Sequence, residues 1–273
     1  MTPLLFAGLA ALTYGASDFY GGMATRRADA IRVVLWSQIV GLGLGLVAAP
    51  LFGGGIGLVD VVWAGAAGLA GALGLVSLYS GLSRGRAAVV APMSGVLSGV
   101  VPAVVGFGLG ERPSVITLLG FVLAAVAVWL VSGGRLEKAS GFSLGVLAGL
   151  GFGLFFVFLS PIPETAGLWP LIPARAASVA VLLMLTLRRS TPAASVDRST
   201  ARLIGAVGVG DMLANVFILL ALQRGPLGEG AVVSSLYPAV TVVLSALILK
   251  EAVRRYQWVG LGLAVVAMAL IAA

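Results

Sequence analysis

The sequence predicts an all-α integral membrane protein of ten transmembrane helices, arranged as two inverted five-helix repeats. Three observations predict this fold class. Of the 273 residues, 60% are hydrophobic and only 10% are charged, whereas a soluble domain carries about 25% charged residues. The chain contains ten apolar stretches that can each span a bilayer, and its second half repeats its first half.

Each apolar stretch approaches the ~20 residues that a spanning helix needs. The N-terminal stretch lacks the positive start of a signal peptide and is followed by further spans, so we expect it to be the first helix. The connectors are short, and residues 188–202 form the one polar loop. The predicted helices cover residues 3–23, 31–51, 60–80, 87–108, 114–133, 141–161, 168–187, 203–221, 229–249 and 256–273.

The internal repeat is visible without a gap. A shift of 140 aligns residues 65–131 with 205–271, and 19 of these 67 positions are identical, where composition alone gives roughly one in nine. We therefore predict two repeats, 1–137 and 138–273. An odd number of helices per repeat makes the two halves oppositely oriented, which is the usual plan of secondary transporters.

The net charge of +7 follows from basic residues in the connectors. All 17 Lys and Arg residues except Arg112, Arg175 and Arg224 lie at connectors that follow odd-numbered helices. Basic connectors usually face the cytoplasm, so we predict both termini on the outer face. This pattern is typical of topology signals, and we expect no nucleic-acid partner.

The composition excludes several kinds of chemistry. The chain has no cysteine and no histidine, so we expect no disulfide, no metal site, no cofactor and no histidine base. Residues 141–145 fit the G-x-S-x-G pattern of hydrolases, but they open a predicted membrane helix. The glycine runs at 106–110 and 149–153 have no preceding strand, and we interpret both as packing glycines. We therefore expect no enzyme.

Three segments carry a resemblance to a known family. The run RGRAAVVAPMSGVLSGVVPAVVGFGLGERPS (84–114), its partner in the second half (224–271) and YGASDFYGG (14–22) resemble EamA-type members of the drug/metabolite transporter superfamily. The resemblance covers nearly the whole chain. It implies a central cavity lined mainly by helices 1, 3, 4, 6, 8 and 9, in a family that includes exporters of amino acids and other metabolites.

Asp211 is the strongest candidate for a functional residue. It lies about eight residues into the eighth predicted helix, with Asn215 one turn later on the same face. A carboxylate near mid-membrane costs several kcal/mol unless it faces protein or water, so it indicates a role in binding substrate or a proton. The alternative is a structural hydrogen bond or ion pair between helices.

Asp18 and Arg175 are the other ionisable candidates. Asp18 lies towards the end of the first helix, where it could bind a substrate amine, carry a proton or cap the helix. Arg175 lies about a turn and a half inside the seventh helix. It could pair with a substrate carboxylate or with Asp211, or its side chain could extend to the interface.

Hydroxyl groups and prolines mark the fourth and ninth helices. A proline bends a helix and frees a carbonyl, which suits a cavity wall or a hinge. Each single serine also fits ordinary helix packing, and the tyrosines, like Trp36, also fit anchoring at the interface. Further substrate-binding candidates are Ser94, Ser98, Ser234, Tyr237, Tyr14 and Tyr79; hinge candidates are Pro92, Pro102 and Pro238. Glu111 and Glu251 end these helices in matched positions, and we interpret them as structural charges.

We expect a secondary transporter that exports amino acids or similar small metabolites by alternating access between the repeats. Its expected partners are a small-molecule substrate and the lipid bilayer. Asp18 and Asp211 permit proton coupling without requiring it. We expect a monomer in a bacterial cytoplasmic membrane. The alternatives are a channel, which needs a ring of filter residues, and a lipid-handling or membrane-enzyme subunit, which needs a nucleophile–base pair or a metal site.

Overall fold

The computed structural model describes residues 2–84, 87–131, 141–188, 197–250 and 254–272, and none of these residues forms a strand. The predicted repeat boundary near residue 137, and Glu251, lie outside these ranges. The described helices are α1 (Pro3–Thr25), α2 (Ala30–Leu51), α3 (Leu58–Ser83), α4 (Ala87–Gly108), α5 (Val115–Val131), α6 (Phe142–Leu159), the 3₁₀ helix η1 (Glu164–Ala166), α7 (Leu171–Leu187), α8 (Arg198–Leu222), α9 (Leu227–Ser234), α10 (Tyr237–Ile248) and α11 (Arg255–Ala272).

Most predicted boundaries agree with these helices to within a few residues. The start of α8 is an exception, because Arg198 already belongs to the helix although 188–202 was predicted as a loop. Asp197 caps this helix by accepting a hydrogen bond from the N–H of Thr200 at 3.1 Å. Hydrogen bonds from the Ser199 hydroxyl and from Thr200 lower the pKa of the Asp197 carboxyl to about 2. This cap allows a charged first turn to be helical.

Several helices are apolar enough to cross a membrane. Five stretches within the described ranges reach the necessary length: Ala30–Leu51, Leu58–Ser83, Phe142–Leu159, Arg198–Leu222 and Leu227–Ile248, the last comprising α9 and α10. Four shorter apolar helices accompany them, namely Met93–Gly108, Val115–Leu130, Leu171–Leu187 and Arg255–Ile271. The protein is therefore an all-helical membrane protein with many apolar helices.

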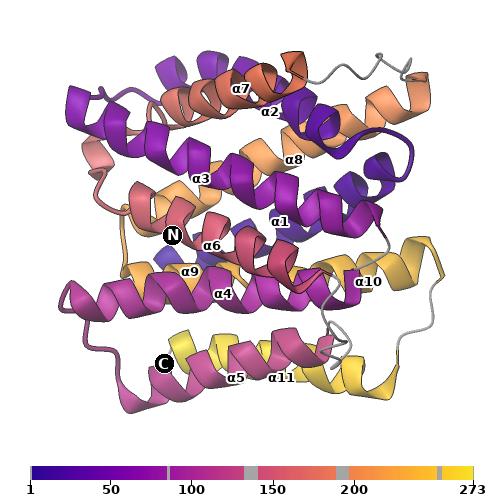
Figure 1. The fold of residues 1–273 in the computed structure, drawn as a ribbon. Helices are drawn as coiled ribbons and strands as arrows, with labels where there is room; N and C mark the ends of the chain where they lie inside the picture. The colour runs from indigo at the N-terminus through magenta and orange to yellow at the C-terminus, as the bar shows by residue number, and fades with distance from the viewer. Residues whose placement is uncertain (1, 85–86, 132–140, 189–196, 251–253, 273) are drawn as a thin grey trace.

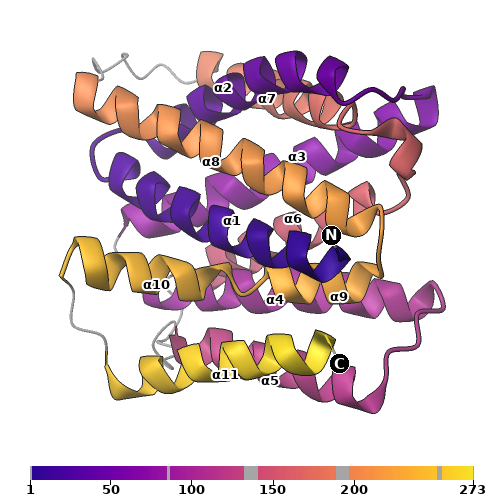
Figure 2. The same cartoon turned by 180° about the vertical axis from the view of Figure 1, so that it is seen from behind.

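The two halves of the chain interleave. α1 packs most closely on α8, and α3 packs on α6, so the central contacts join opposite halves. In the repeat, α6 is the counterpart of α1 and α8 is the counterpart of α3. The α1–α8 contact and the α3–α6 contact are therefore equivalent. The remaining counterparts pack on each other, with α2 and α7 at one edge and α5 and α11 at the other edge (Figures 1 and 2).

Counterpart helices run in opposite directions. In Figure 1, α1 runs from left to right and its counterpart α6 runs from right to left. The ends of α1, α3, α7 and α10 consequently lie on the right, together with the starts of α2, α4, α8 and α11. The helix ends that flank the basic connectors, which are predicted to face the cytoplasm, therefore lie at one end of the bundle.

Glycines bring α6 close to its neighbours. A Cβ added to Gly149 would lie 2.5 Å from the Cβ of Leu97 on α4, and Gly145 and Gly153 meet Met93 and Val101 in the same way. The packing role predicted for 149–153 is therefore confirmed. The run at 106–110 is mixed. Gly106 leaves room for the carboxyl group of Glu111, whereas Gly108 has no neighbour within 4 Å and Gly110 has a φ of +95°, which fits a turn after α4.

The ninth predicted helix is broken. α9 ends at Ser234 and α10 begins at Tyr237, just before Pro238. Proline has no N–H to donate to the carbonyl of Ser234 four residues earlier, and its ring crowds that carbonyl, which favours a kink or a break at this point. α4 is uninterrupted across Pro92 and Pro102, and the side chain of Pro92 lies outside the described part. In the repeat alignment, Ser98 of α4 occupies the position of Pro238. This difference fits the break that is present between α9 and α10 and absent from α4.

Glu111 ties the two repeats together at one end of the bundle. Its Oε1 accepts a hydrogen bond from the N–H of Leu227 at 2.5 Å, and its Oε2 accepts one from Gly228 at 3.0 Å. The carboxylate thus caps the N-terminus of α9, where free N–H groups and the helix dipole favour negative charge. This arrangement confirms the structural role expected for Glu111.

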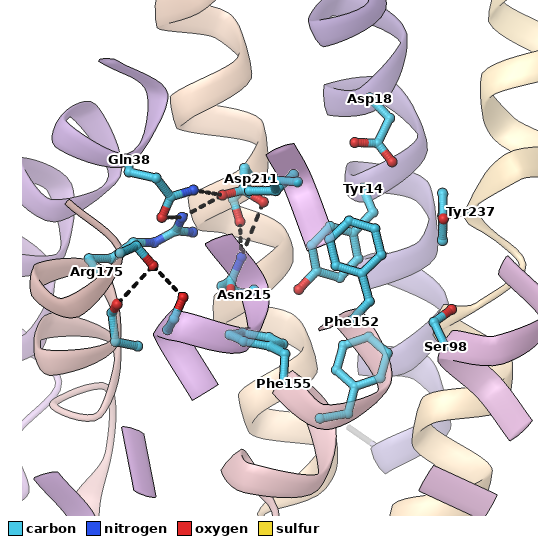
Figure 3. Close-up of a pocket in the computed structure, with 16 residues that line it drawn as sticks. Tyr14, Asp18, Gln38, Ser98, Phe152, Phe155, Arg175, Asp211, Asn215 and Tyr237 are labelled. Carbon is cyan, nitrogen blue, oxygen red and sulfur yellow. Dashed lines mark hydrogen bonds and ion pairs between the residues drawn. The ribbon is translucent and has the colours of Figure 1, made fainter. Parts of the chain in front are cut away.

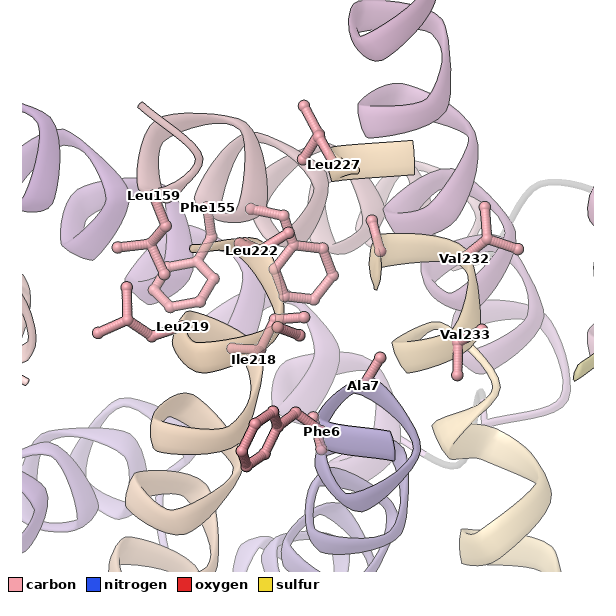
Figure 4. Packing of buried hydrophobic residues seen from close by; sticks show 14 of the residues in the cluster. Phe6, Ala7, Phe155, Leu159, Ile218, Leu219, Leu222, Leu227, Val232 and Val233 are labelled. Atoms are coloured by element: carbon pink, nitrogen blue, oxygen red, sulfur yellow. The ribbon is translucent and has the colours of Figure 1, made fainter. Parts of the chain in front are cut away.

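Two apolar clusters fill the bundle. The larger one joins α1, α6, α8 and α9 through residues such as Phe6, Leu159, Ile218 and Val233 (Figure 4). The second gathers residues nearer the other ends of α1 and α8, including Ala24 and Val207. The middle of the bundle lies between these clusters.

Candidate functional site

A cavity lies in the middle of the bundle. It lies at half-height because its lining residues occupy the central turns of α1, α3 and α8, between the two apolar clusters. The lining comes from both halves of the chain and consists of Tyr14, Asp18, Gln38, Gly68, Gly71, Leu75, Ser98, Phe152, Phe155, Phe156, Ala174, Arg175, Ser178, Asp211, Asn215 and Tyr237.

One wall of the cavity holds a buried ion pair. Nη1 of Arg175 lies 2.5 Å from Oδ2 of Asp211, and it also donates to Oε1 of Gln38 at 2.6 Å. Nε2 of Gln38 donates to the same Asp211 oxygen at 3.2 Å (Figure 3). The three residues come from α7, α8 and α2, so this cluster joins both halves of the chain.

Asn215 supports the acid from one turn further along α8. Its Nδ2 donates to the backbone carbonyl of Asp211 at 2.6 Å and lies 3.4 Å from Oδ1. Both residues are 5% exposed and line the cavity. The polar face predicted for α8 from the four-residue spacing is therefore present.

Arg175 reaches the cluster because neighbouring helices leave room for it. The residue is only 4% exposed. The alternative prediction that its side chain extends to the membrane interface is therefore wrong. A Cβ at Gly41 would lie 3.2 Å from Nε of Arg175, so this glycine of α2 accommodates the guanidinium group. Nη2 is buried and has no hydrogen-bond partner in the described part of the chain, which is costly for a charged donor.

Asp18 lies elsewhere in the cavity. It is 7% exposed, and its Oδ1 accepts a hydrogen bond from the hydroxyl of Tyr79 at 3.4 Å. The last residue of α1 is Thr25, so Asp18 lies inside the helix and does not cap it. In Figure 3, Asp18 lies apart from the Arg175–Asp211 pair, and the Tyr14 ring lies below both carboxylates.

Aromatic side chains form much of the remaining wall. Tyr14 lies 6.4 Å from Phe156 and Phe152 lies 6.4 Å from Tyr237, measured between ring centroids. The hydroxyls of Tyr237 and Ser94 are 2.6 Å apart. The site thus combines one charged cluster, one separate acid and a broad apolar surface, which is typical of a small-molecule site.

Seven of the ten predicted substrate-binding residues line the cavity: Asp211, Asn215, Asp18, Arg175, Tyr14, Ser98 and Tyr237. The other three lie behind the lining. Tyr79 is fully buried against Asp18, Ser94 contacts Tyr237, and Ser234 donates to the carbonyl of Ala7 at 3.3 Å. Trp36 is 53% exposed and does not line the cavity.

Sequence reasoning missed Gln38, Ser178 and the phenylalanines of α6. Gln38 lies two residues after Trp36 in an apolar stretch. Its polar side chain was the one usable signal in the sequence, because an amide in a membrane helix needs a partner. The phenylalanines gave no signal, since phenylalanine is equally common on lipid-facing surfaces. The described residues contain no group of three or more acidic or other metal-ligating side chains.

Comparison with known proteins decides the family. The model of the EamA-like transporter family matches residues 1–133 and again residues 139–273. The chain belongs to the EamA-like transporter family. The resemblance noted in the sequence is thereby confirmed, and the protein is an EamA-like member of the drug/metabolite transporter superfamily.

Solved structures share the fold of this EamA-like protein. Twenty-nine chains match it. One of them, described only as a crystal structure of a protein, covers 98% of this chain and 95% of its own length, with a TM-score of 0.76 and 17% identity. At this identity the match shows the fold alone. No curated protein matches the chain.

Proposed function

We propose that this EamA-like protein is a secondary transporter that exports amino acids or similar small metabolites across a bacterial cytoplasmic membrane. The observation that carries the proposal is the central cavity, which contains buried charged groups and is built from both repeats. Membrane-embedded charges are expensive and typically mark substrate or ion pathways. The mixture of a few polar groups and a broad aromatic wall also suits a small metabolite.

The transport cycle follows from the arrangement of the halves. In this proposal α9 and α10 count as one interrupted span, so the chain has ten spans in two inverted five-helix repeats, divided near residue 137. Rocking of one repeat against the other exposes the cavity to each side of the membrane in turn. The break before Pro238 supplies a bending point next to Tyr237, which lines the cavity. The substrate-binding residues are those that line the cavity, with Asp211 and Asn215 at their centre.

Counterflow in liposomes tests the proposal. Purified protein is reconstituted with a mixture of unlabelled amino acids inside, and uptake of each labelled amino acid is followed. A carrier gives saturable uptake with a transient overshoot above equilibrium. Flux that rises linearly with concentration and shows no overshoot would indicate a channel and refute alternating access.

A further inference from the structure

The cavity holds a carboxylate that no base neutralises. Among the described lining residues, the charged side chains are Asp18, Arg175 and Asp211. Arg175 and Asp211 form a direct ion pair, so their charges cancel locally. One positive and two negative groups leave a formal charge of −1, which belongs to Asp18 when its carboxyl is ionised. When Asp18 is ionised, the charge of the cavity is therefore balanced by one additional positive group.

Asp18 is also poorly satisfied by hydrogen bonds. Within the described part of the chain, the Tyr79 hydroxyl is the one donor to its carboxylate, at a long distance of 3.4 Å. An ionised carboxylate that is 7% exposed needs a closer partner, because burial of an unpaired charge costs several kcal/mol. Arg175 does not provide this partner, since it already contacts Asp211, and it lies apart from Asp18 in Figure 3.

The rings that share the cavity with Asp18 suit a cation. Tyr14, Phe152 and Tyr237 line the same space, together with Phe155 and Phe156. The face of an aromatic ring attracts an ammonium group within about 6 Å, most strongly where water is excluded. The same rings bury an apolar ligand body, so the wall is complementary to both parts of an organic cation.

The unpaired Nη2 of Arg175 would favour an anionic ligand group, but this atom is not accessible. Nη2 is buried, and Nη1 of the same guanidinium group already donates to Gln38 and Asp211. An anionic ligand group would have to displace part of this cluster. Asp18 is available without any such rearrangement.

We propose that Asp18 binds the cationic nitrogen of the substrate, and that the cavity takes small organic cations with an apolar body. The inference rests on the proposed function, because it names the substrate class of the same cavity. The ammonium group pairs with the Asp18 carboxylate, and the apolar body lies against the aromatic wall. A proton is the competing occupant, and it would neutralise Asp18 without any need for the rings.

Binding of matched probes tests this inference. Phenethylammonium, benzyltrimethylammonium, 2-phenylethanol and 3-phenylpropionate share an aromatic body and differ in charge. Their affinities at neutral pH are measured from the shift in unfolding temperature of the detergent-solubilised protein. The variants are Asp18→Asn and the control Asp60→Asn, which changes a half-buried acid outside the cavity, in the first turn of α3, whose Oδ2 accepts a hydrogen bond from the N–H of Gly57.

We expect both ammonium probes to stabilise the wild type and Asp60→Asn, and to bind Asp18→Asn about tenfold more weakly or worse. The neutral and anionic probes should bind weakly to all three proteins. Equal or tighter binding of 2-phenylethanol or 3-phenylpropionate to the wild type would overturn the inference, as would absence of any stabilisation by the ammonium probes. If Asp18→Asn does not fold, this ranking in the wild type decides the question.

The same preparations separate this inference from the proposed function. Saturable counterflow of an anionic or neutral solute, without ammonium binding, would overturn the cationic substrate class and leave the transporter in place. Ammonium binding that requires Asp18, with no saturable counterflow of any solute, would support the site and overturn the proposed transport.

Discussion

Arg175 of α7 and Asp211 of α8 form an ion pair in which Nη1 and Oδ2 are 2.5 Å apart and both side chains are at most 7% exposed. Gln38 of α2 hydrogen-bonds to both partners. The pair therefore ties together helices of both repeats in the middle of the membrane. Each partner is needed to neutralise the other.

Asp211→Asn should consequently lower the stability of the protein. The change leaves the Arg175 charge uncompensated, which costs on the order of 3 kcal/mol for a buried pair. The double variant Arg175→Met/Asp211→Asn should be more stable than Asp211→Asn, because no lone charge is left. Thermal unfolding in detergent measures both effects. An unchanged unfolding temperature for Asp211→Asn would contradict this account of the pair.

Glu111→Gln should destabilise the protein by about 1 kcal/mol, since it weakens the charged cap of α9. The control is Glu164→Gln, which removes a more exposed ion pair between Glu164 and Arg224, at 2.6 Å. That pair should contribute less, and its effect should disappear at high salt. Unfolding temperatures at low and high salt provide the comparison; equal and equally salt-sensitive losses would argue against the cap.

Gly149→Ala should destabilise the contact between α4 and α6. The new Cβ would lie 2.5 Å from Cβ of Leu97 and 2.9 Å from the carbonyl oxygen of Met93, and such overpacking costs about 1–3 kcal/mol. Gly8→Ala is the matched control, because nothing lies within 4 Å of its added Cβ. We expect Gly8→Ala to be neutral or slightly stabilising in the same unfolding assay. Similar losses for both variants would count against close packing at Gly149.

Much of the fold was predictable because lipid imposes simple rules on a chain. Hydropathy located the helices, and the 140-residue shift revealed the repeat. The break between Ser234 and Tyr237 was only suggested by Pro238, since a proline in a membrane helix causes either a kink or a break. The start of α8 at Arg198 depended on the cap made by Asp197, which a count of charged residues in a loop does not capture.

The candidate site was harder to predict than the fold. Depth in the membrane singled out Asp211, Asp18 and Arg175, because a buried charge is costly at any rotation of its helix. Which of them pair depends on helix rotation and packing, and glycines such as Gly41 decide this only in three dimensions. Tyr79 was assigned to the cavity because sequence alone does not separate a lining residue from one that supports it.

Single cysteines test the predicted topology, since the chain contains no cysteine of its own. Ala193→Cys lies in the basic connector before α8, and we expect it to be cytoplasmic. Thr165→Cys lies in η1 at the opposite end of the bundle and is exposed. In intact cells a membrane-impermeant maleimide should label position 165 and not position 193. The reverse pattern would place both termini in the cytoplasm.

The central claim is that the cavity around Asp211 binds the transported substrate. Its most direct test is counterflow by liposomes that contain the wild type, Asp211→Asn or Asp60→Asn, at a temperature where all three proteins are folded. We predict that Asp60→Asn retains wild-type counterflow and that Asp211→Asn loses it by about tenfold or more. Counterflow by folded Asp211→Asn at the wild-type rate, with unchanged pH dependence, would contradict the account.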